Sequence, residues 1–258
     1  MKTFDDLVAE ASEVPIAGWD FSWLEGRATE ERPSWGYQRL MSQRLGSARA
    51  ALDIDTGGGE VLAGAQPFPV AMAATESWPP NVEAATKLLH PLGVVVVATT
   101  DDSPLPFGDG AFDLIISRHP VRPRWTEIAR LLTPGGRYFA QHVGPSSAFE
   151  LVEFFLGPQP DSHSRDPAVE ASAAKAAGLD IVDLRTERLR MEFFDVGAIV
   201  YFLRLVIWMV PDFTVDAYVN RLRQVHELLD ADGPFVAHST RTLIEARKPA
   251  AGLAVRPD

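Results

Sequence analysis

The stretch ALDIDTGGGE, residues 51–60, joins an apolar segment directly to three consecutive glycines. Residues 50–54 have the composition of a buried strand, and a glycine-rich turn after a strand exposes backbone N–H groups that a ligand can approach closely. A nucleotide-phosphate loop would end in Gly-Lys-Ser or Gly-Lys-Thr, whereas Gly-Glu-Val stands here. A dinucleotide loop would need a third glycine where Leu62 stands. Three glycines alone also fit a plain tight turn, so the rest of the chain has to identify the ligand.

Strand signals alternate with helix signals along the chain, which is typical of an α/β fold with a mostly parallel sheet. The segment GVVVVAT, residues 93–99, is almost wholly apolar, as expected for a strand covered on both faces. Residues 18–33 are expected to be an aromatic-rich connection. The expected strands are residues 50–54, 70–75, 93–99, 111–118, 137–144, 181–194 and 234–249. The expected helices are residues 5–13, 34–46, a segment after the glycines, 79–89, 125–132, 168–177, 196–210 and 214–230.

The bulk composition is that of a soluble globular protein and excludes several classes of function. The 258 residues are 46% hydrophobic and 23% charged, with a formal net charge of −11. Such an acidic balance argues against a protein that binds nucleic acid through its phosphates. The absence of cysteine excludes disulfides, thiolate metal sites and cysteine nucleophiles. The acidic N-terminus does not read as a signal peptide, and Arg204 interrupts the longest apolar run, so a cytoplasmic protein is expected.

Four motifs follow one another between residues 50 and 144. The first is the glycine loop with its preceding acid, and the second is Glu76 at the end of the next expected strand. The third, TTDDSPLPFGDGAFDLIISRH (residues 99–119), holds an acid, Leu-Pro-Phe, a turn and Phe-Asp-Leu. The fourth, WTEIARLLTPGGRYFAQHV (residues 125–143), is a helix, a Pro-Gly-Gly turn and a strand. Together they resemble class I S-adenosylmethionine (SAM)-dependent methyltransferases, particularly the small-molecule type 11 group.

The resemblance implies a fold as well as an activity. The expected fold is α/β, a Rossmann-like seven-stranded, mostly parallel sheet with helices on both faces. N-terminal helices and a helical lid between the last two strands are added to it. Residues 1–49 would be a helical segment contributing to the lid, residues 50–258 the methyltransferase domain, and residues 193–233 the lid insertion.

The implied cofactor is SAM, which has two ribose hydroxyls, an adenine amino group, an α-ammonium and a sulfonium. A carboxylate accepts hydrogen bonds from a vicinal diol or an amine. The resemblance therefore assigns Glu76 to the ribose, Asp101 or Asp102 to adenine, and Asp53 to the amino-acid end. Trp78 would either cover the adenine or pack on the surface. The expected cofactor-binding residues are Asp53, Asp55, Gly57, Gly59, Glu76, Trp78, Asp101, Asp102 and Ser117.

Asp55 is where the sequence departs from the family, because it replaces the first glycine of the loop motif. Its side chain is expected to crowd the cofactor, and its charge to repel the SAM carboxylate while attracting the ammonium and the sulfonium. Three outcomes stay open: normal binding with a shifted loop, weakened binding, or a chain that has lost its cofactor.

His119 and His142 are the candidate general bases, since each follows or ends an expected strand near the carboxyl edge of the sheet. Each is equally a candidate for a hydrogen-bonded structural histidine. A base is needed only if the acceptor is a hydroxyl or a protonated amine, because in-line methyl transfer depends mainly on positioning. No His, Asp or Glu cluster has metal-ligand spacing, so no metal is expected.

The segments outside the motifs are rich in aromatic residues, which predicts an apolar pocket for an acceptor, ordinary helix packing, or a dimer face. The favoured function is O-methylation of a small molecule, with a SAM-fold binding or regulatory protein without turnover as the alternative. An RNA methyltransferase and an NAD-dependent oxidoreductase are disfavoured. No nucleic acid or membrane partner is expected, and a homodimer is possible. The aromatic residues concerned are Trp19, Phe21, Trp23, Trp35, Tyr37, Phe193, Phe194, Tyr201, Phe202 and Trp208.

Overall fold

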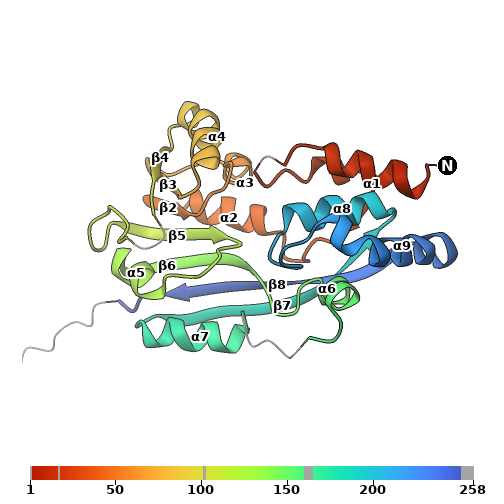
Figure 1. The fold of residues 1–258 in the computed structure, drawn as a ribbon. Helices are drawn as coiled ribbons and strands as arrows, with labels where there is room; N and C mark the ends of the chain where they lie inside the picture. The colour runs from red at the N-terminus through yellow and green to blue at the C-terminus, as the bar shows by residue number, and fades with distance from the viewer. Residues whose placement is uncertain (1, 17, 101–102, 160–164, 251–258) are drawn as a thin grey trace, which may run out of the picture. The chain divides into compact units, whose positions relative to one another are not determined.

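The computed structural model describes residues 2–16, 18–100, 103–159 and 165–250 (Figure 1). They divide into two compact units, which are described in turn. Unit 1 comprises Met1–Arg32, Pro145–Ser162 and Arg188–Thr240. Unit 2 comprises Pro33–Gly144, His163–Glu187 and Arg241–Asp258.

The described strands form one mixed sheet in the order β1-β7-β8-β6-β5-β2-β3-β4. The pairs β2–β3, β3–β4, β2–β5 and β5–β6 are parallel, whereas β8 runs antiparallel to β6. The strands are β1 (Ala28–Glu30), β2 (Ala50–Ile54), β3 (Ala71–Glu76), β4 (Val95–Ala98), β5 (Phe112–Arg118), β6 (Leu132–Val143), β7 (Asp180–Phe193) and β8 (Phe235–Arg247).

The α/β class is confirmed, but the described residues form eight strands where seven were expected. The additional strand, β1, lies within the segment predicted as a connection and pairs antiparallel with the end of β7, with Ala28 opposite Phe193. The prediction that β4 is covered on both faces is wrong. β4 is the edge strand of the sheet, and Val95 is 57% exposed.

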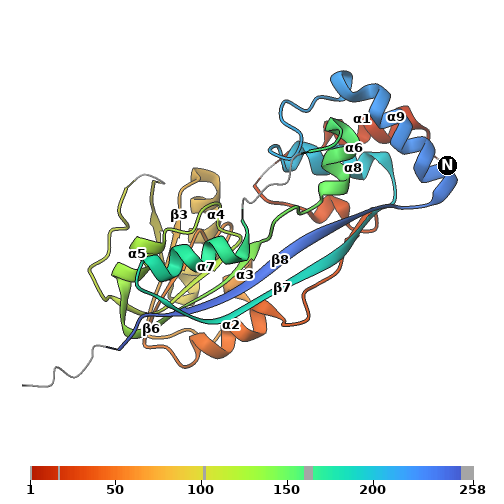
Figure 2. The ribbon, with the colours of Figure 1, turned by 90° about the horizontal axis from the view of Figure 1, so that it is seen from below.

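In unit 2, helices cover both faces of the sheet (Figure 2). One face packs against α2, α3 and α4, and the other against α5 and α7. The alternation of β2 divides its side chains between the two cores, so that Ala51 belongs to the first and Leu52 to the second. The helices are α2 (Tyr37–Leu45), α3 (Glu60–Ala63), α4 (Pro79–Leu89), α5 (Trp125–Leu131) and α7 (Pro167–Ala176), with a 3₁₀ turn at His90–Leu92.

Unit 1 is built around α8, in which every residue except Arg204 is buried. The Arg204 guanidinium donates hydrogen bonds to the carbonyl oxygens of Ala11 and Val14, at the end of α1. A Cβ at Gly197 would lie 2.8 Å from the Leu7 carbonyl oxygen, so this glycine lets α1 and α8 pack closely. The helices are α1 (Phe4–Glu13), α6 (Phe149–Leu156), α8 (Val196–Leu205) and α9 (Val215–Asp232), with a 3₁₀ turn at Ser22–Leu24.

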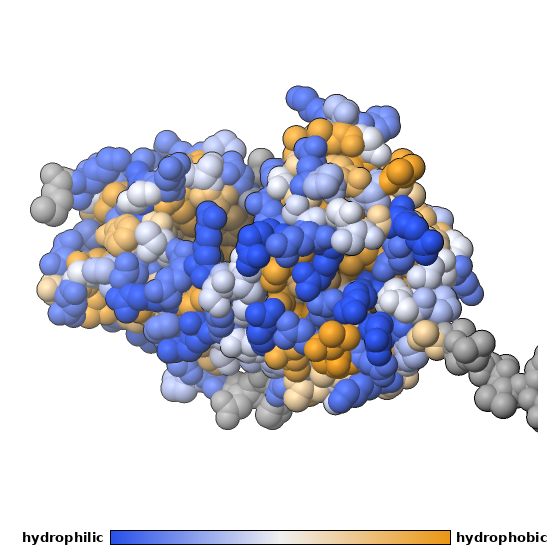
Figure 3. Space-filling model, turned by 180° about the vertical axis from the view of Figure 1, so that it is seen from behind, coloured by the Kyte–Doolittle hydropathy of each residue, from blue (hydrophilic) through white to orange (hydrophobic). Residues whose placement is uncertain are grey.

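The helices expected near residues 196–210 and 214–230 are present as α8 and α9, whereas α6 was not predicted. α2 belongs to unit 2, although the sequence-based division placed it in the N-terminal segment. In the part of the chain that the structure describes, no helix is long and apolar enough to cross a bilayer. Figure 3 shows separate hydrophobic patches on a mostly hydrophilic face.

Candidate cofactor-binding site

The glycine loop follows β2, the strand at which the order of strands in the parallel part of the sheet reverses. β2 lies between β3 and β5, and the chain adds β3 and β4 on one side before it returns to add β5 and β6 on the other. In open parallel sheets, ligands bind in the crevice outside the carboxyl ends of the strands at such a switch point. The structure therefore places the loop where a cofactor site is expected.

Three residues of the loop have left-handed backbone conformations. Their φ angles are 59° at Asp55, 65° at Gly57 and 88° at Gly59. Glycine adopts such angles without cost, and aspartate is among the few other residues that do so with modest strain. The backbone at Asp55 thus has a conformation that glycine adopts freely and that aspartate tolerates better than most residues.

The two glycines serve different purposes. A Cβ at Gly59 would lie 2.9 Å from side-chain atoms of Leu89, so this glycine allows α4 to pack against the loop. A Cβ at Gly57 would meet no atom within 4 Å, so the space beside it is open. Only Gly57 thus leaves room on its exposed side for a ligand.

Glu76, at the end of β3, is 6% exposed and is bonded to the glycine loop. Its Oε2 accepts a hydrogen bond from the Gly57 N–H at 2.8 Å. Its Oε1 accepts from the N–H groups of Ser77 and Trp78 at 2.9 and 3.0 Å. These three bonds fix the carboxylate beside the loop, and Oε2 keeps one lone pair for a further donor.

Asp53 is also 6% exposed, and its carboxyl group has a raised pKa. Burial raises its pKa from 3.8 to about 7, with the nearby Thr56 hydroxyl acting in the opposite direction and the charges of Asp55 and Glu76 adding to the rise. Three carboxyl groups therefore lie close enough at this loop to interact. Such a site attracts a cation, and a bound cation would favour the ionised form of Asp53.

The other predicted cofactor residues are placed differently. Trp78 is 44% exposed at the start of α4. Ser117 is buried; its hydroxyl donates to the Ile54 carbonyl oxygen at 2.9 Å and so ties β5 to β2. Asp101 and Asp102 lie outside the described residues.

His119 follows β5 and has a left-handed φ of 58°. Its backbone N–H donates to the Gln141 carbonyl oxygen at 2.7 Å, and its Nε2 lies 3.1 Å from the Gln141 amide nitrogen. Burial lowers the pKa of its imidazole well below 6.5, and the charges of Arg118 and Arg241 lower it further. His119 is therefore a neutral imidazole at the carboxyl edge of the sheet.

His142 is 2% exposed, and both of its ring nitrogens have partners. Nδ1 donates to the Glu170 carboxylate, and Nε2 accepts a hydrogen bond from the Tyr138 hydroxyl at 3.0 Å. Burial raises the pKa of Tyr138 well above 10, so its hydroxyl stays protonated. In this arrangement His142 links β6 to α7 and leaves no ring nitrogen to accept a proton from a substrate.

Sequence reasoning missed Gln141, and for two aromatic residues the structure supports the alternative of ordinary core packing. Trp35 and Tyr37 were candidates for an acceptor pocket, but they are 3% and 6% exposed in the core of unit 2. The Tyr37 hydroxyl donates to the Ser117 carbonyl oxygen at 2.8 Å. Gln141 binds Trp35 about a hundred positions away in the chain, which no local pattern reveals.

The acceptor-pocket candidates in unit 1 divide by exposure. Phe193, Tyr201 and Phe202 are buried in its core, so they do not form an open surface. Trp19 and Trp208 are 49% and 53% exposed, and their rings meet at 5.3 Å. Trp208 lines a hollow of about 590 Å³ within unit 1.

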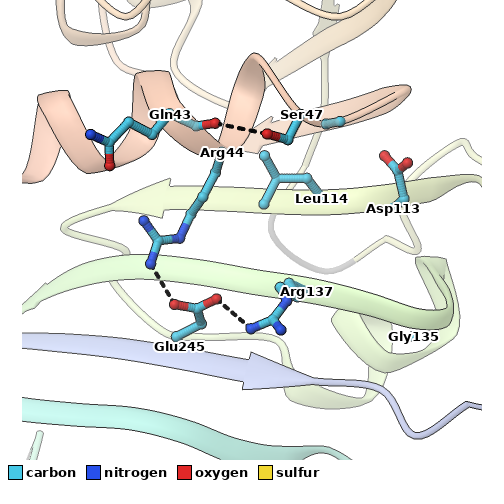
Figure 4. A pocket seen from close by; sticks show the side chains of 9 residues that line it. Gln43, Arg44, Ser47, Asp113, Leu114, Gly135, Arg137 and Glu245 are labelled. Carbon is cyan, nitrogen blue, oxygen red and sulfur yellow. Dashed lines mark hydrogen bonds and ion pairs between the residues drawn. The ribbon is translucent and has the colours of Figure 1, made fainter.

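A second hollow, of about 420 Å³, is shown in Figure 4. It lies at the amino ends of the parallel strands of unit 2, whereas the glycine loop lies at their carboxyl ends. Asp113, near the start of β5, lines it, whereas Ser117 and His119 stand at the other end of that strand. Arg44 and Arg137 both donate to Glu245, at 2.5 and 2.8 Å. Their charges are thus used to join α2, β6 and β8.

The comparisons with known proteins agree with this geometry. Residues 52–140 match a family model described as a methyltransferase domain. A candidate methyltransferase from Bacillus halodurans has a similar structure, with a TM-score of 0.56 and 17% identity over 83% of this chain and 99% of that one. A protein of unknown function from Deinococcus radiodurans gives 0.58 and 18%, over 86% and 90%. A search of curated protein sequences finds no match.

A further similar structure is a candidate methyltransferase from Haloferax volcanii, solved in complex with the Trm112 methyltransferase activator. Its TM-score is 0.51, with 19% identity over 97% of this chain and 99% of that one. At these identities the structures show a shared fold. The family model assigns residues 52–140, which include the glycine loop, to a methyltransferase domain, and this supports a SAM-dependent methyltransferase.

Proposed function

We propose that the protein binds SAM at the glycine loop and transfers its methyl group to an oxygen of a small-molecule acceptor. The observation that carries the proposal is the convergence of Asp53, Asp55 and Glu76 on a loop at the switch point of the sheet. SAM has two positive groups and a ribose diol, and carboxylates satisfy both. The donors and acceptors present therefore fit this cofactor.

Each carboxylate has a distinct role in the proposal. Glu76 is already oriented by three N–H groups, and the remaining lone pair of its Oε2 accepts a ribose hydroxyl. Asp53 faces the amino-acid end and pairs with the α-ammonium. Trp78 covers the adenine, and Asp101 or Asp102 accepts from its amino group. When bound, SAM supplies an electrophilic methyl group, and the residues around it place the acceptor in line with the sulfur.

The lid remains part of the proposal with the bounds that the sequence predicts, residues 193–233 with a contribution from residues 1–49. The net charge of −11 disfavours RNA as the acceptor. A small molecule is the better candidate for this reason.

A binding or regulatory protein without turnover is the alternative function, and the observation that favours it is Asp55. Asp55 stands at the position where the resembled family has a glycine, two residues before Gly57. Titration calorimetry with SAM, S-adenosylhomocysteine and NAD, followed by an assay for S-adenosylhomocysteine release, separates these functions. SAM binding with release supports the proposal. SAM binding without release across acceptor classes supports the alternative, and NAD binding alone contradicts both.

A further inference from the structure

A chain of hydrogen bonds fixes the protonation of His119. The Trp35 indole N–H donates to the Gln141 side-chain oxygen at 2.9 Å. Indole nitrogen is a donor only, so the amide oxygen must face Trp35 and the amide NH₂ must face His119. The His119 Nε2, 3.1 Å from that NH₂, must then accept. The single proton of the neutral ring is therefore on Nδ1.

Nδ1 is the nitrogen left for a ligand. Within the described residues, it makes no hydrogen bond. Because Nδ1 carries the proton and the Nε2 lone pair is occupied by Gln141, the ring offers a donor and no site to receive a proton. His119 is arranged as a hydrogen-bond donor rather than as a general base.

His119 lies beside the cofactor loop and among positive charges. Ser117 is paired with Ile54 across β5 and β2, so His119, two residues further on, stands at the level of the glycine loop. The charges of Arg118, Arg241 and Arg165 act on its ring. Arg118 and Arg241 already interact with other groups of the protein, but the positive charges still act at the ring. Together with one N–H donor they suit a group that is negatively charged and accepts hydrogen bonds.

We propose that His119 donates its Nδ1–H to an anionic oxygen group of the acceptor, such as a carboxylate, with Trp35 and Gln141 as positioning residues. This names the substrate class of the proposed methyltransferase and rests on that function. An acceptor of this class is held by charge and hydrogen bonds at one end. Methyl transfer then proceeds without a histidine base, so the acceptor oxygen that attacks is ionised before it binds.

The tautomer is tested by ¹⁵N NMR of histidine-labelled protein without cofactor, so the result does not depend on SAM binding. We expect a protonated Nδ1 and an unprotonated Nε2 at His119 between about pH 6 and 8, the range in which free histidine titrates. The Gln141→Glu variant replaces the NH₂ by an acceptor, so Nε2 should become protonated. A protonated Nε2 in the unaltered protein would overturn the proposal.

The acceptor class is tested with benzoate and benzamide as probes, added to the S-adenosylhomocysteine complex. We expect benzoate to bind at least about tenfold more tightly than benzamide, the scale of a hydrogen bond to a charged group, and to shift the His119 Nδ1–H signal. His119→Ala should abolish the preference, His119→Asn should restore part of it through its amide N–H, and His90→Ala should leave it unchanged. Equal binding of the two probes, or no response at His119, would overturn the proposal. Failure of S-adenosylhomocysteine to bind would instead refute the cofactor assignment.

Discussion

Replacement of Asp55 by glycine tests whether its side chain obstructs the cofactor. The residue has a φ of 59°, where a non-glycine residue is strained by about 1–2 kcal/mol, whereas glycine costs about 0.5–1 kcal/mol more in chain entropy. The two effects nearly cancel, so the backbone contribution of Asp55→Gly to the free energy of unfolding should be no more than about 1 kcal/mol. A difference in SAM affinity would then report on the site rather than on folding.

We expect Asp55→Gly to tighten SAM binding by about 1 kcal/mol, or about fivefold in Kd, the scale of relieving modest overpacking. Asp55→Asn is the matched control, because asparagine keeps the size of the side chain and tolerates the same backbone angle. Both variants remove a charge that helps to raise the pKa of Asp53, so that pKa should fall in each. If crowding dominates, only the glycine variant tightens binding; if charge repulsion dominates, both do.

The assay is calorimetric titration of the three proteins with SAM and with S-adenosylhomocysteine. Weaker SAM binding in both variants would refute the crowding argument and give Asp55 a direct role. A loss confined to SAM would place its carboxylate at the sulfonium, which the product lacks. A loss for both ligands would place it at the ammonium.

Three further predictions follow from the hydrogen bonds and pKa values of unit 2. Glu76→Gln should weaken SAM binding by about 1.5–3 kcal/mol. It should also lower the free energy of unfolding, because the Gly57 N–H would face an NH₂ group. Equal SAM affinity of the two proteins would remove Glu76 from the site. Since the pKa of Asp53 is raised to about 7, SAM affinity should rise by about tenfold from pH 6 to 8. The stabilisation that protonated Asp53 gives the folded state should be lost as the pH rises from about 4, the usual pKa of an aspartate, to about 7. A flat affinity profile, or a rise retained in Asp53→Asn, would contradict the prediction. His142→Ala should lower the free energy of unfolding, measured by thermal or urea denaturation, by about 2–4 kcal/mol, because it leaves Tyr138 and Glu170 without their partner. A near-neutral effect would contradict the structural role of this hydrogen-bond network.

The long elements of the fold were predictable from periodicity, and the short or uniformly apolar ones were not. β1 has three residues, too few for alternation to be visible, and its pairing with β7 depends on a partner far along the chain. α6 has only eight residues, and its polar face consists of Glu150 and Glu153 alone, so the amphipathic pattern is too short to stand out in the sequence. β4 reads as a central strand because valine runs do not reveal which strand ends the sheet.

For the site, spacing located the residues of the loop but not their partners. The glycines and Glu76 lie within about twenty-five residues, in an order that the family resemblance recognises. The protonation of His119 depends on Gln141 and Trp35, which reach it from β6 and from the segment before α2. Contacts of that kind are set by the sheet, so only the structure reveals them.

The most direct test of the central claim is titration of the unaltered protein with SAM at pH 8, where Asp53 is mostly ionised. The three carboxylates and the open loop predict one SAM per chain, with a Kd within the range of about 1 μM to 1 mM typical of enzyme substrates. The same titration with NAD should give no heat of binding. A protein that binds NAD, or that shows no heat with SAM at either pH 6 or pH 8, would contradict the assignment of this loop as a SAM site.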